Sequence, residues 1–207
     1  QIAERVPEPE YYQGGNFYFF HTKYSPKNNR IMQVVRVLFP EYMPEKSGWN
    51  PQLFTFNTDG SDIQLAIGRE LWATGGNHPN WHPDGEHLIM NLTPDGENRR
   101  FCQFRYDGSD FKILTEKFLG SGHPSIEPEG RYIITDTYVR WGWQNKKGEV
   151  PIRLIDLSAE EEQVVAWIDT FGENRGSLRV DPHPAWSRDY KSVCFNAISN
   201  GNRQVYI

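Results

Sequence analysis

The stretch that decides the fold runs from Gly76 to Asn91 and reads GNHPNWHPDGEHLIMN. Its first His-Pro pair returns twice, as GHPSI at Gly122–Ile126 and as PHPAW at Pro182–Trp186. In each copy a strand-like segment ends in Asn or Asp 13 residues after the histidine, at positions 78 and 91, 123 and 136, and 183 and 196. This equal spacing indicates an internal repeat, which is the first feature to seek in a sequence.

Each copy continues with a turn and further short strands. NTDGSD at 57–62 and YDGSD at 106–110 have the form of matching hairpins, because Asp-Gly between alternating apolar residues is a strong hairpin signal. The first two histidines are 45 residues apart (78 to 123), and four short strands in about 45 residues describe one blade of a β-propeller. The sequence therefore predicts an all-β propeller with blades at roughly 16–72, 78–118, 123–170 and, incomplete, 183–207.

The predicted blades amount to about three and a half. Propellers with this blade length are expected to have about six to eight blades, so the chain corresponds to half a ring. An open half ring would expose two sheet faces. The sequence has no initiator Met and stops on an apolar strand pattern at Ile207. We therefore expect a further segment or another chain to supply the remaining blades.

Composition limits the classes of partner. The chain has 207 residues, of which 37% are hydrophobic and 24% charged, enough for a sizeable core. Its net charge of -5 argues against nucleic acid as the main partner, and no apolar run approaches the roughly 20 residues that span a bilayer. The two cysteines indicate neither a disulfide framework nor a zinc knuckle. The segment AEEEQVVAWI at 159–168 fits either a helix or a fourth strand.

The recurring histidines have two interpretations. They could mark the turn that enters each blade, with Trp81 and Trp186 packing between blades. Alternatively, if each begins the innermost strand of its blade, His78, His123 and His183 lie together at one mouth of the central channel. Three imidazoles in a concave site suggest a metal, a proton-transfer site or both. Asp181, two residues before His183, could add a metal ligand or orient a ring.

The longer interval between the second and third histidines carries an insertion, Trp141–Gly148. Its two tryptophans, Trp141 and Trp143, could stack on sugar rings or simply cap the loop. We therefore expect Trp141 and Trp143 either to line a sugar-binding site or to cap the insertion loop.

Several of these motifs together resemble the seven-bladed propeller polysaccharide lyases, namely the oligogalacturonate lyases and related ulvan lyases. The resemblance rests on GGNHPNW, GSGHPSI, PIRLIDL, LRVDPHPAW and the final RQVYI. It runs from about Phe17 to Ile207 and matches the C-terminal half of such an enzyme. It implies β-elimination on an anionic oligo- or polysaccharide that contains uronic acid.

The resemblance also implies catalytic roles for three residues. His78, in NHPNW, matches the base of the oligogalacturonate lyases. Arg30, which follows a strand bearing a histidine and precedes Ile-Met, matches the arginine that offsets the substrate carboxylate. A tyrosine upstream of this arginine, as in the ulvan-type relatives, would be Tyr12 or Tyr11. Tyr12 would give a proton to the leaving oxygen or act as the base itself.

A metal site is implied in the same way. His123 matches the first metal ligand of the family, and His183 is kept in its last metal cluster. Asp181 and Leu178 stand where the family has His and Gln. The resemblance thus implies a divalent metal, manganese, zinc or calcium, held by His123, His183 and Asp181.

A second hypothesis is a non-catalytic propeller that binds protein or glycan, as many propellers do. The changed positions Leu178 and Asp181 favour it. A third is an accessory module of a periplasmic transport system built on similar PDG repeats. A metal between His123 and His183, with a pocket for a carboxylate beside Arg30, would favour the enzyme. A channel plugged by aromatic side chains would favour the binding protein.

Overall fold

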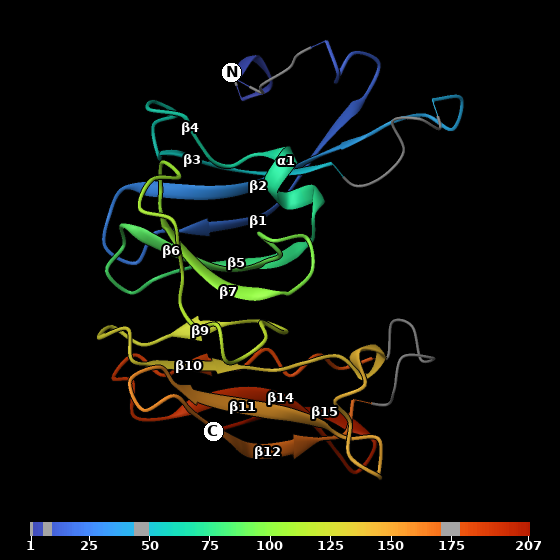
Figure 1. Cartoon of the computed structure of the whole chain (residues 1–207), viewed down its shortest axis with the longest axis vertical. Helices are drawn as coiled ribbons and strands as arrows, with labels where there is room; N and C mark the ends of the chain where they lie inside the picture. The colour runs from blue at the N-terminus through green and yellow to red at the C-terminus, as the bar shows by residue number, and fades with distance from the viewer. Residues whose placement is uncertain (1, 6–9, 44–49, 171–178) are drawn as a thin grey trace.

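The computed structural model describes residues 2–5, 10–43, 50–170 and 179–207. These residues form four antiparallel sheets, three with four strands and the last with three. In Figure 1 the sheets follow one another from the blue N-terminal end to the red C-terminal end. The predicted all-β propeller is confirmed, and we refer to the sheets in chain order as blades 1 to 4.

Strands within each blade follow the order of the sequence. Blade 1 contains β1 (Asn16–Tyr24), β2 (Arg30–Leu38), β3 (Pro51–Asn57) and β4 (Gln64–Ile67). Blade 2 contains β5 (Gly76–Trp81), β6 (His87–Leu92), β7 (Arg100–Arg105) and β8 (Lys112–Ile113). Blade 3 contains β9 (Ser125–Ile126), β10 (Tyr132–Thr135), β11 (Val150–Asp156) and β12 (Glu161–Ile168). Blade 4 contains β13 (Ala185–Trp186), β14 (Val193–Ser199) and β15 (Asn202–Tyr206).

Helical structure among the described residues is short. α1 spans Arg69–Ala73 between blades 1 and 2, while η1 (Ala3–Arg5) and η3 (Val139–Trp141) are single 3₁₀ turns. The ambiguous segment at 159–168 forms strand β12 rather than a helix. No helix in the described part of the chain is long and apolar enough to cross a membrane.

The two Asp-Gly hairpins are equivalent in the structure, as predicted. Gly60 and Gly108 have φ angles of 83° and 84°, a region that glycine adopts without strain. The turn is closed in both cases by a backbone hydrogen bond, from Asn57 to Ser61 (2.9 Å) and from Arg105 to Ser109 (2.8 Å). Local sequence therefore sets the register of β3 with β4 and of β7 with β8.

Apolar side chains fill the space between successive blades. One cluster joins Met32 and Leu53 of blade 1 to Trp81, Leu88 and Met90 of blade 2. The repeat tryptophans also form polar contacts across the junction. Trp81 Nε1 donates to the Lys23 carbonyl (3.0 Å), and Trp186 Nε1 donates to the Ser125 carbonyl (3.1 Å). Packing between blades, expected for these tryptophans, is confirmed.

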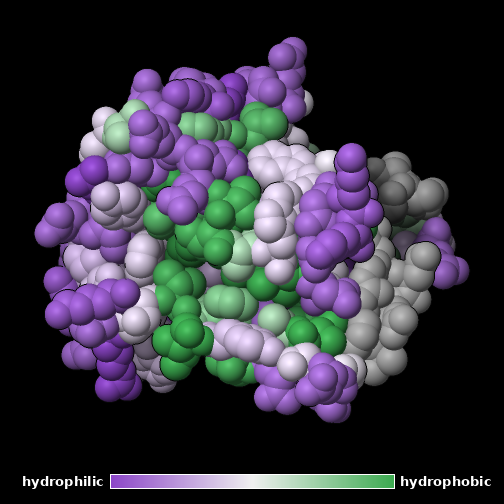
Figure 2. Space-filling model, turned by 90° about the horizontal axis from the view of Figure 1, so that it is seen from below, coloured by the Kyte–Doolittle hydropathy of each residue, from purple (hydrophilic) through white to green (hydrophobic). Residues whose placement is uncertain are grey.

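The face below the molecule in Figure 1 carries a broad hydrophobic area, shown in green in Figure 2. Strands β12 and β15 lie in the last two blades and have exposed apolar side chains, namely Val164, Val165, Trp167, Val205 and Tyr206. Large exposed apolar areas mark interaction surfaces.

The core between blades 1 and 2 predicts a stability test. Leu88 is fully buried in that core, so Leu88→Ala should lower the free energy of unfolding by about 2–5 kcal/mol. Val164→Ala on the exposed face of β12 is the matched control and should change it by less than about 0.5 kcal/mol. Denaturant unfolding of both variants measures the difference. Equal effects would contradict the packing described here.

Candidate functional site

The site begins with irregularities in the first strand of each blade. His21 and His78 have φ angles of 54° and 56° and lie where the pairing of β1 with β2 and of β5 with β6 shifts register. His183, just before β13, has a φ of 46°. Such bulges re-aim a side chain out of the regular ladder. The direction of these histidine side chains is therefore set by the irregular backbone at each position, and not by the regular in-and-out alternation of side chains along a strand.

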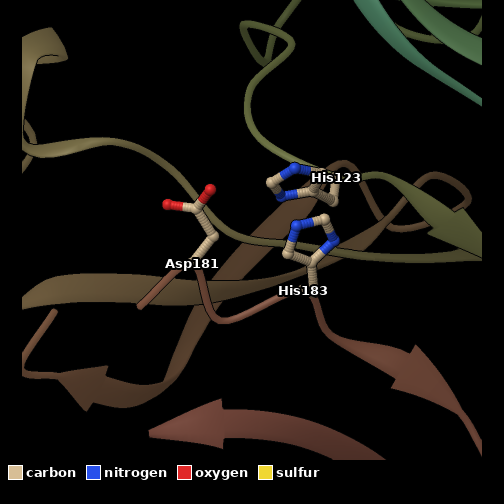
Figure 3. A group of neighbouring side chains, drawn as sticks. All are labelled: His123, Asp181 and His183. Carbon is tan, nitrogen blue, oxygen red and sulfur yellow. The ribbon is translucent and has the colours of Figure 1, made fainter. Parts of the chain in front are cut away.

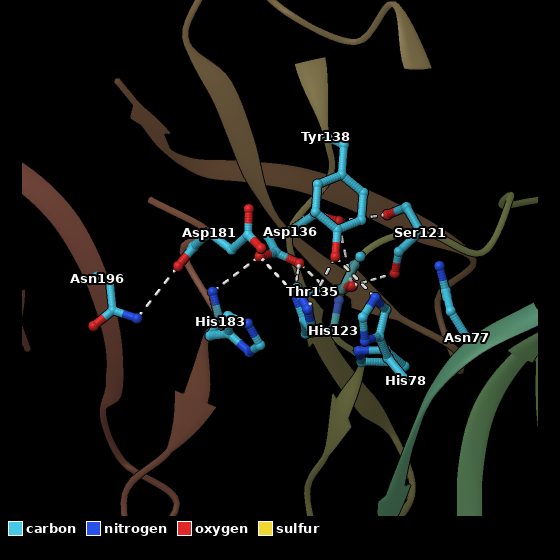
Figure 4. Close-up of polar contacts among 12 residues, drawn as sticks. Asn77, His78, Ser121, His123, Thr135, Asp136, Tyr138, Asp181, His183 and Asn196 are labelled. Atoms are coloured by element: carbon cyan, nitrogen blue, oxygen red, sulfur yellow. Dashed lines mark hydrogen bonds and ion pairs between the residues drawn. The ribbon is translucent and has the colours of Figure 1, made fainter. Parts of the chain in front are cut away.

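The three repeat histidines are brought together. The ring centroids of His78 and His123 are 3.9 Å apart, and those of His123 and His183 are 3.4 Å apart. Figure 4 shows them arriving from neighbouring blades beside Asp136 and Tyr138. A fourth imidazole, that of His21, lies 6.3 Å from His78. The residues adjoin a cavity of about 410 Å³ that is also lined by Lys23 and Asn80.

Asp136 holds this cluster in place. Its carboxylate is fully buried and accepts the backbone N–H groups of His123 (2.7 Å) and His183 (2.9 Å). It also contacts Nδ1 of His123 at 2.9 and 3.0 Å. Burial alone would raise the pKa of Asp136, but the hydrogen bonds and the charge of His123 outweigh it and lower the pKa. The carboxylate is therefore ionised at neutral pH.

Tyr138 joins two of the imidazoles. Its hydroxyl lies 2.8 Å from Nε2 of His78 and 3.1 Å from Nε2 of His123. Burial, together with the carboxylates of Asp181 and Asp136, raises the pKa of Tyr138. The phenol consequently keeps its proton at neutral pH.

Hydrogen-bond chemistry assigns the protons in this network. His78 has a lowered pKa, because it is buried and faces the charges of other histidines and Lys23, so it is neutral. With Asp136 ionised, Nδ1 of His123 donates to it, and the Nδ1–H tautomer of His123 leaves Nε2 to accept the Tyr138 O–H. The Tyr138 oxygen then accepts Nε2–H of His78. Nδ1 of His78 is left with a lone pair, as a base requires.

A larger cavity, of about 920 Å³, also borders His78. His21, His78 and Tyr138 line it together with Trp72 and Trp141. Its wall also contains four arginines from three blades and their connections, namely Arg36, Arg99, Arg140 and Arg179. This is a positively charged chamber in a protein with a net charge of -5, and it suits an anionic ligand.

His123, Asp181 and His183 form the one group of metal-binding type found among the described residues (Figure 3). One ligand atom from each lies within 4.8 Å of the others. Asp181 is positioned by an ion pair with Arg179 (2.8 Å). Burial lowers the pKa of His183 to about 4, so this imidazole is neutral and able to coordinate. Leu178, the other changed position, lies outside the described residues.

This donor set fits a transition metal. Two imidazoles and one carboxylate suit manganese or zinc, whereas calcium prefers oxygen ligands alone. Asp136 orients His123 through Nδ1, as second-shell carboxylates commonly orient metal-binding histidines. Nε2 of His123 would then be the ligand atom, so a metal would compete with the Tyr138 hydroxyl.

Two residues implied by the resemblance lie elsewhere. Arg30 is buried, forms an ion pair with Asp62 and donates to Thr55 Oγ1 (2.9 Å) beneath the ring of Tyr106. It does not line either cavity that contains His78. The geometry thus assigns Arg30 to holding together strands and a hairpin of blades 1 and 2. Arg30 therefore lies apart from the histidine cluster.

Tyr12 also lies apart from the histidine cluster. Its ring is 4% exposed and packs in an apolar cluster with Val35 and Phe54. Its hydroxyl accepts a hydrogen bond from Gln52 Nε2 (2.9 Å). An aromatic side chain buried in this way fills the core of blade 1, and the tyrosine beside the histidines is Tyr138.

Sequence reasoning missed His21, Tyr138 and the cavity arginines. His21 lies in FYFFHT, at the position of His78 in the preceding blade, but no proline follows it. Tyr138 comes two residues after the repeat residue Asp136, which was a usable signal. The arginines come from unrelated loops and strands, and no spacing in the sequence connects them.

Comparison of the sequence with family models and with curated proteins found no match. The fold is similar to solved propellers. An oligogalacturonate lyase in complex with manganese aligns with a TM-score of 0.63 and 16% identity over 91% of this chain and 47% of that one. The oligogalacturonate lyase from Vibrio parahaemolyticus aligns with a TM-score of 0.63 and 15% identity over 91% and 48%. TolB from Acinetobacter baumannii aligns with a TM-score of 0.56 and 18% identity over 86% and 38%.

These similarities establish a shared β-propeller fold. The chain spans about half the length of the two lyases. At such identities the function of a neighbour does not transfer with the fold, since one propeller serves many functions.

The lowered pKa of His183 predicts a pH dependence of stability. The unfolded imidazole binds a proton near pH 6.5, whereas the folded one does so only near pH 4. The contribution of this group to stability is therefore fully present above pH 6.5 and falls as the pH drops toward 4; because the His183 side chain is partly exposed and screened by solvent, the slope stays below the limit of about 1.4 kcal/mol per pH unit for one proton. His183→Gln should flatten this slope in denaturant unfolding with a chelator present. An unchanged slope would contradict the lowered pKa of this imidazole.

Proposed function

We propose that this chain carries the reaction centre of a polysaccharide lyase that cleaves a glycan containing uronic acid by β-elimination. The observation that carries the proposal is a neutral His78 bonded to a protonated Tyr138 on the wall of a chamber with four arginines. A base, a proton donor and a set of cations are the three elements that this reaction needs.

Cations in the chamber meet the first requirement of the reaction. The C5 proton of a uronate lies next to a carboxylate and is barely acidic while that group keeps its full negative charge. Guanidinium groups bind carboxylates through paired, charge-assisted hydrogen bonds and stabilise the charge that develops on them. Arg36, Arg99, Arg140 and Arg179 share the chamber with His78 and take the role that the sequence assigned to Arg30.

His78 and Tyr138 supply the proton transfers. Nδ1 of His78 takes the C5 proton, the C–H electron pair forms the C4–C5 double bond, and the C4–O4 bond breaks. Tyr138 gives its proton to O4 and recovers one from Nε2–H of His78, with which its oxygen is already in contact. The imidazole returns to its neutral state, so protons and charge balance across the step. The product is an unsaturated uronate.

A metal is compatible with this arrangement. His123, Asp181 and His183 would hold manganese or zinc, and a bound metal would add positive charge near the substrate carboxylate. Of these residues, His123 also contacts the Tyr138 hydroxyl through Nε2 (3.1 Å).

Activity provides the first test. The chain should release unsaturated products, detected by ultraviolet absorbance, from polygalacturonate, oligogalacturonates or ulvan. His78→Ala should lower kcat by about 10²–10⁴, because the base is removed. His87→Ala is the control, because His87 lines neither cavity and contacts Asp84. Full activity of His78→Ala would rule out the base. Binding of uronates without cleavage by the unaltered, folded chain would leave the non-catalytic interpretation.

The lowered pKa of His78 gives a second test. The acidic limb of kcat/KM reports protonation of the base in the free enzyme. We expect that limb below pH 6.5, because burial and the neighbouring charges oppose protonation of His78. A pH–rate profile measures it. A limb at or above pH 6.5 would show that another group titrates.

The Tyr138→Phe variant gives a third test of the proposed function. Removing the hydroxyl should lower kcat by about 10²-fold or more, with little change in KM. Tyr132→Phe in β10, outside both cavities, is the matched control. If Tyr138→Phe kept its kcat, the leaving oxygen would take its proton from another source.

A further inference from the structure

One wall of the large chamber has more positive charge than a single carboxylate needs. Arg99 lies just before β7 in blade 2, while Arg140 and Trp141 belong to the 3₁₀ turn η3 in blade 3. The Arg99 guanidinium carbon is 4.4 Å from the centre of the Trp141 ring, and that of Arg140 is 5.8 Å from the same ring. Two cations from different blades thus meet at one tryptophan.

The charge of Arg99 is poorly compensated within the described part of the chain. Burial and the like charge of Arg140 both lower the pKa of Arg99. Arg99 makes no salt bridge within the described ranges, and its Nε is buried there without a hydrogen-bond partner. Arg179, by contrast, is paired with Asp181. A buried donor left unpaired beside a like charge is costly unless a ligand satisfies it.

The pair is connected to the reaction centre. Trp141 packs edge-to-face against Tyr138 with ring centres 4.8 Å apart, and the hydroxyl of Tyr138 contacts His78. Arg140 also lies over the Tyr138 ring at 4.6 Å. All of these residues line the same chamber. A chain of sugars that placed one ring at His78 would therefore bring a neighbouring ring to Trp141 and Arg99.

We propose that Arg99, Arg140 and Trp141 form a second anion subsite, which binds the acidic group of the sugar next to the one being cleaved. This inference rests on the proposed function and specifies its substrate: an oligosaccharide with acidic groups on adjacent or nearby residues. The oxyanion is either the carboxylate of a second uronate or a sulfate ester. Both match the planar fork of a guanidinium.

Binding, rather than turnover, tests the subsite. Calorimetry would be done on the full chain with His78→Ala, so that the ligand is not consumed. Arg99→Gln in this background should weaken binding of trigalacturonate by about 10-fold or more, since the charge-assisted hydrogen bond from the Arg99 guanidinium to the ligand is lost. Binding of galacturonate monomer should stay within about 2-fold, because one acidic sugar can be held by the remaining arginines.

Controls separate the subsite from general effects of charge. Arg105→Gln removes an arginine that pairs with Glu86 and lines neither chamber, so it should leave trigalacturonate binding unchanged. Should Arg99→Gln fail to fold, Arg140→Gln alters the same subsite at an exposed residue and should show the same selective loss. Equal losses for monomer and trimer, or no loss for either variant, would overturn the subsite.

A comparison of ligands shows whether the subsite binds a sulfate ester or a carboxylate. Native and chemically desulfated ulvan oligosaccharides would be compared with trigalacturonate. An Arg99-dependent preference for the native form assigns the subsite to sulfate, and dependence with trigalacturonate alone assigns it to carboxylate. Cleavage by the unaltered chain is measured separately. Selective, Arg99-dependent binding without any cleavage would refute the lyase and retain the subsite. Cleavage by the unaltered chain, together with ligand binding that does not depend on Arg99, would support the lyase and refute the subsite.

Discussion

The buried carboxylate of Asp136 is the constraint on which the site depends. It has no exposed surface, yet it is ionised, because two backbone N–H groups and one imidazole N–H point at it. The two backbone donors belong to His123 and His183, which open successive blades. One carboxylate therefore fixes the spacing of the blades, the conformation of both histidines and the tautomer of one. Removing it would leave three donors unpaired in an interior that cannot compensate them.

The same position in the preceding blade explains the 13-residue spacing of the repeat. Asn91 is also fully buried, and its amide donates to the carbonyls of Ser121 and Gly122 at the entrance to blade 3 and to Asn77 in its own blade. Asn196 donates to the carbonyl of Asp181 in blade 4. Blades 2, 3 and 4 thus each place a polar group, within or just after the second strand, that holds the loop entering a first strand. Blade 3 alone uses a charged group in this role among these three, and it is there that the histidines and Tyr138 meet.

The fold and the histidine cluster could be predicted because both follow from the repeat. A residue that recurs at one position of every blade must gather near the axis, whatever the side chains between. Arg30 and Tyr12 were matched to the lyases one residue at a time, with no repeat to support them. In the structure Arg30 pairs with Asp62, and Tyr12 is hydrogen-bonded to Gln52 in the core of blade 1. The arginines of the chamber could not be found, since proximity created by loops from different blades leaves no periodic trace in the sequence.

The low pKa of His78 and its proposed role as a base must be reconciled. Burial and the surrounding imidazoles and Lys23 make the free imidazole a weak base, well suited to remaining neutral but poorly suited to removing a carbon-bound proton. In the proposed reaction a uronate in the chamber would change this balance, because a carboxylate beside His78 favours the imidazolium and raises its pKa. The arginines also pair with that carboxylate, which limits the rise in the pKa of His78. Their own stabilisation of the carboxylate would be strongest in the transition state, when more negative charge moves onto it. In the proposed reaction the imidazole would therefore be a stronger base when an acidic substrate is bound, so the charge that the chamber recognises would also activate the base.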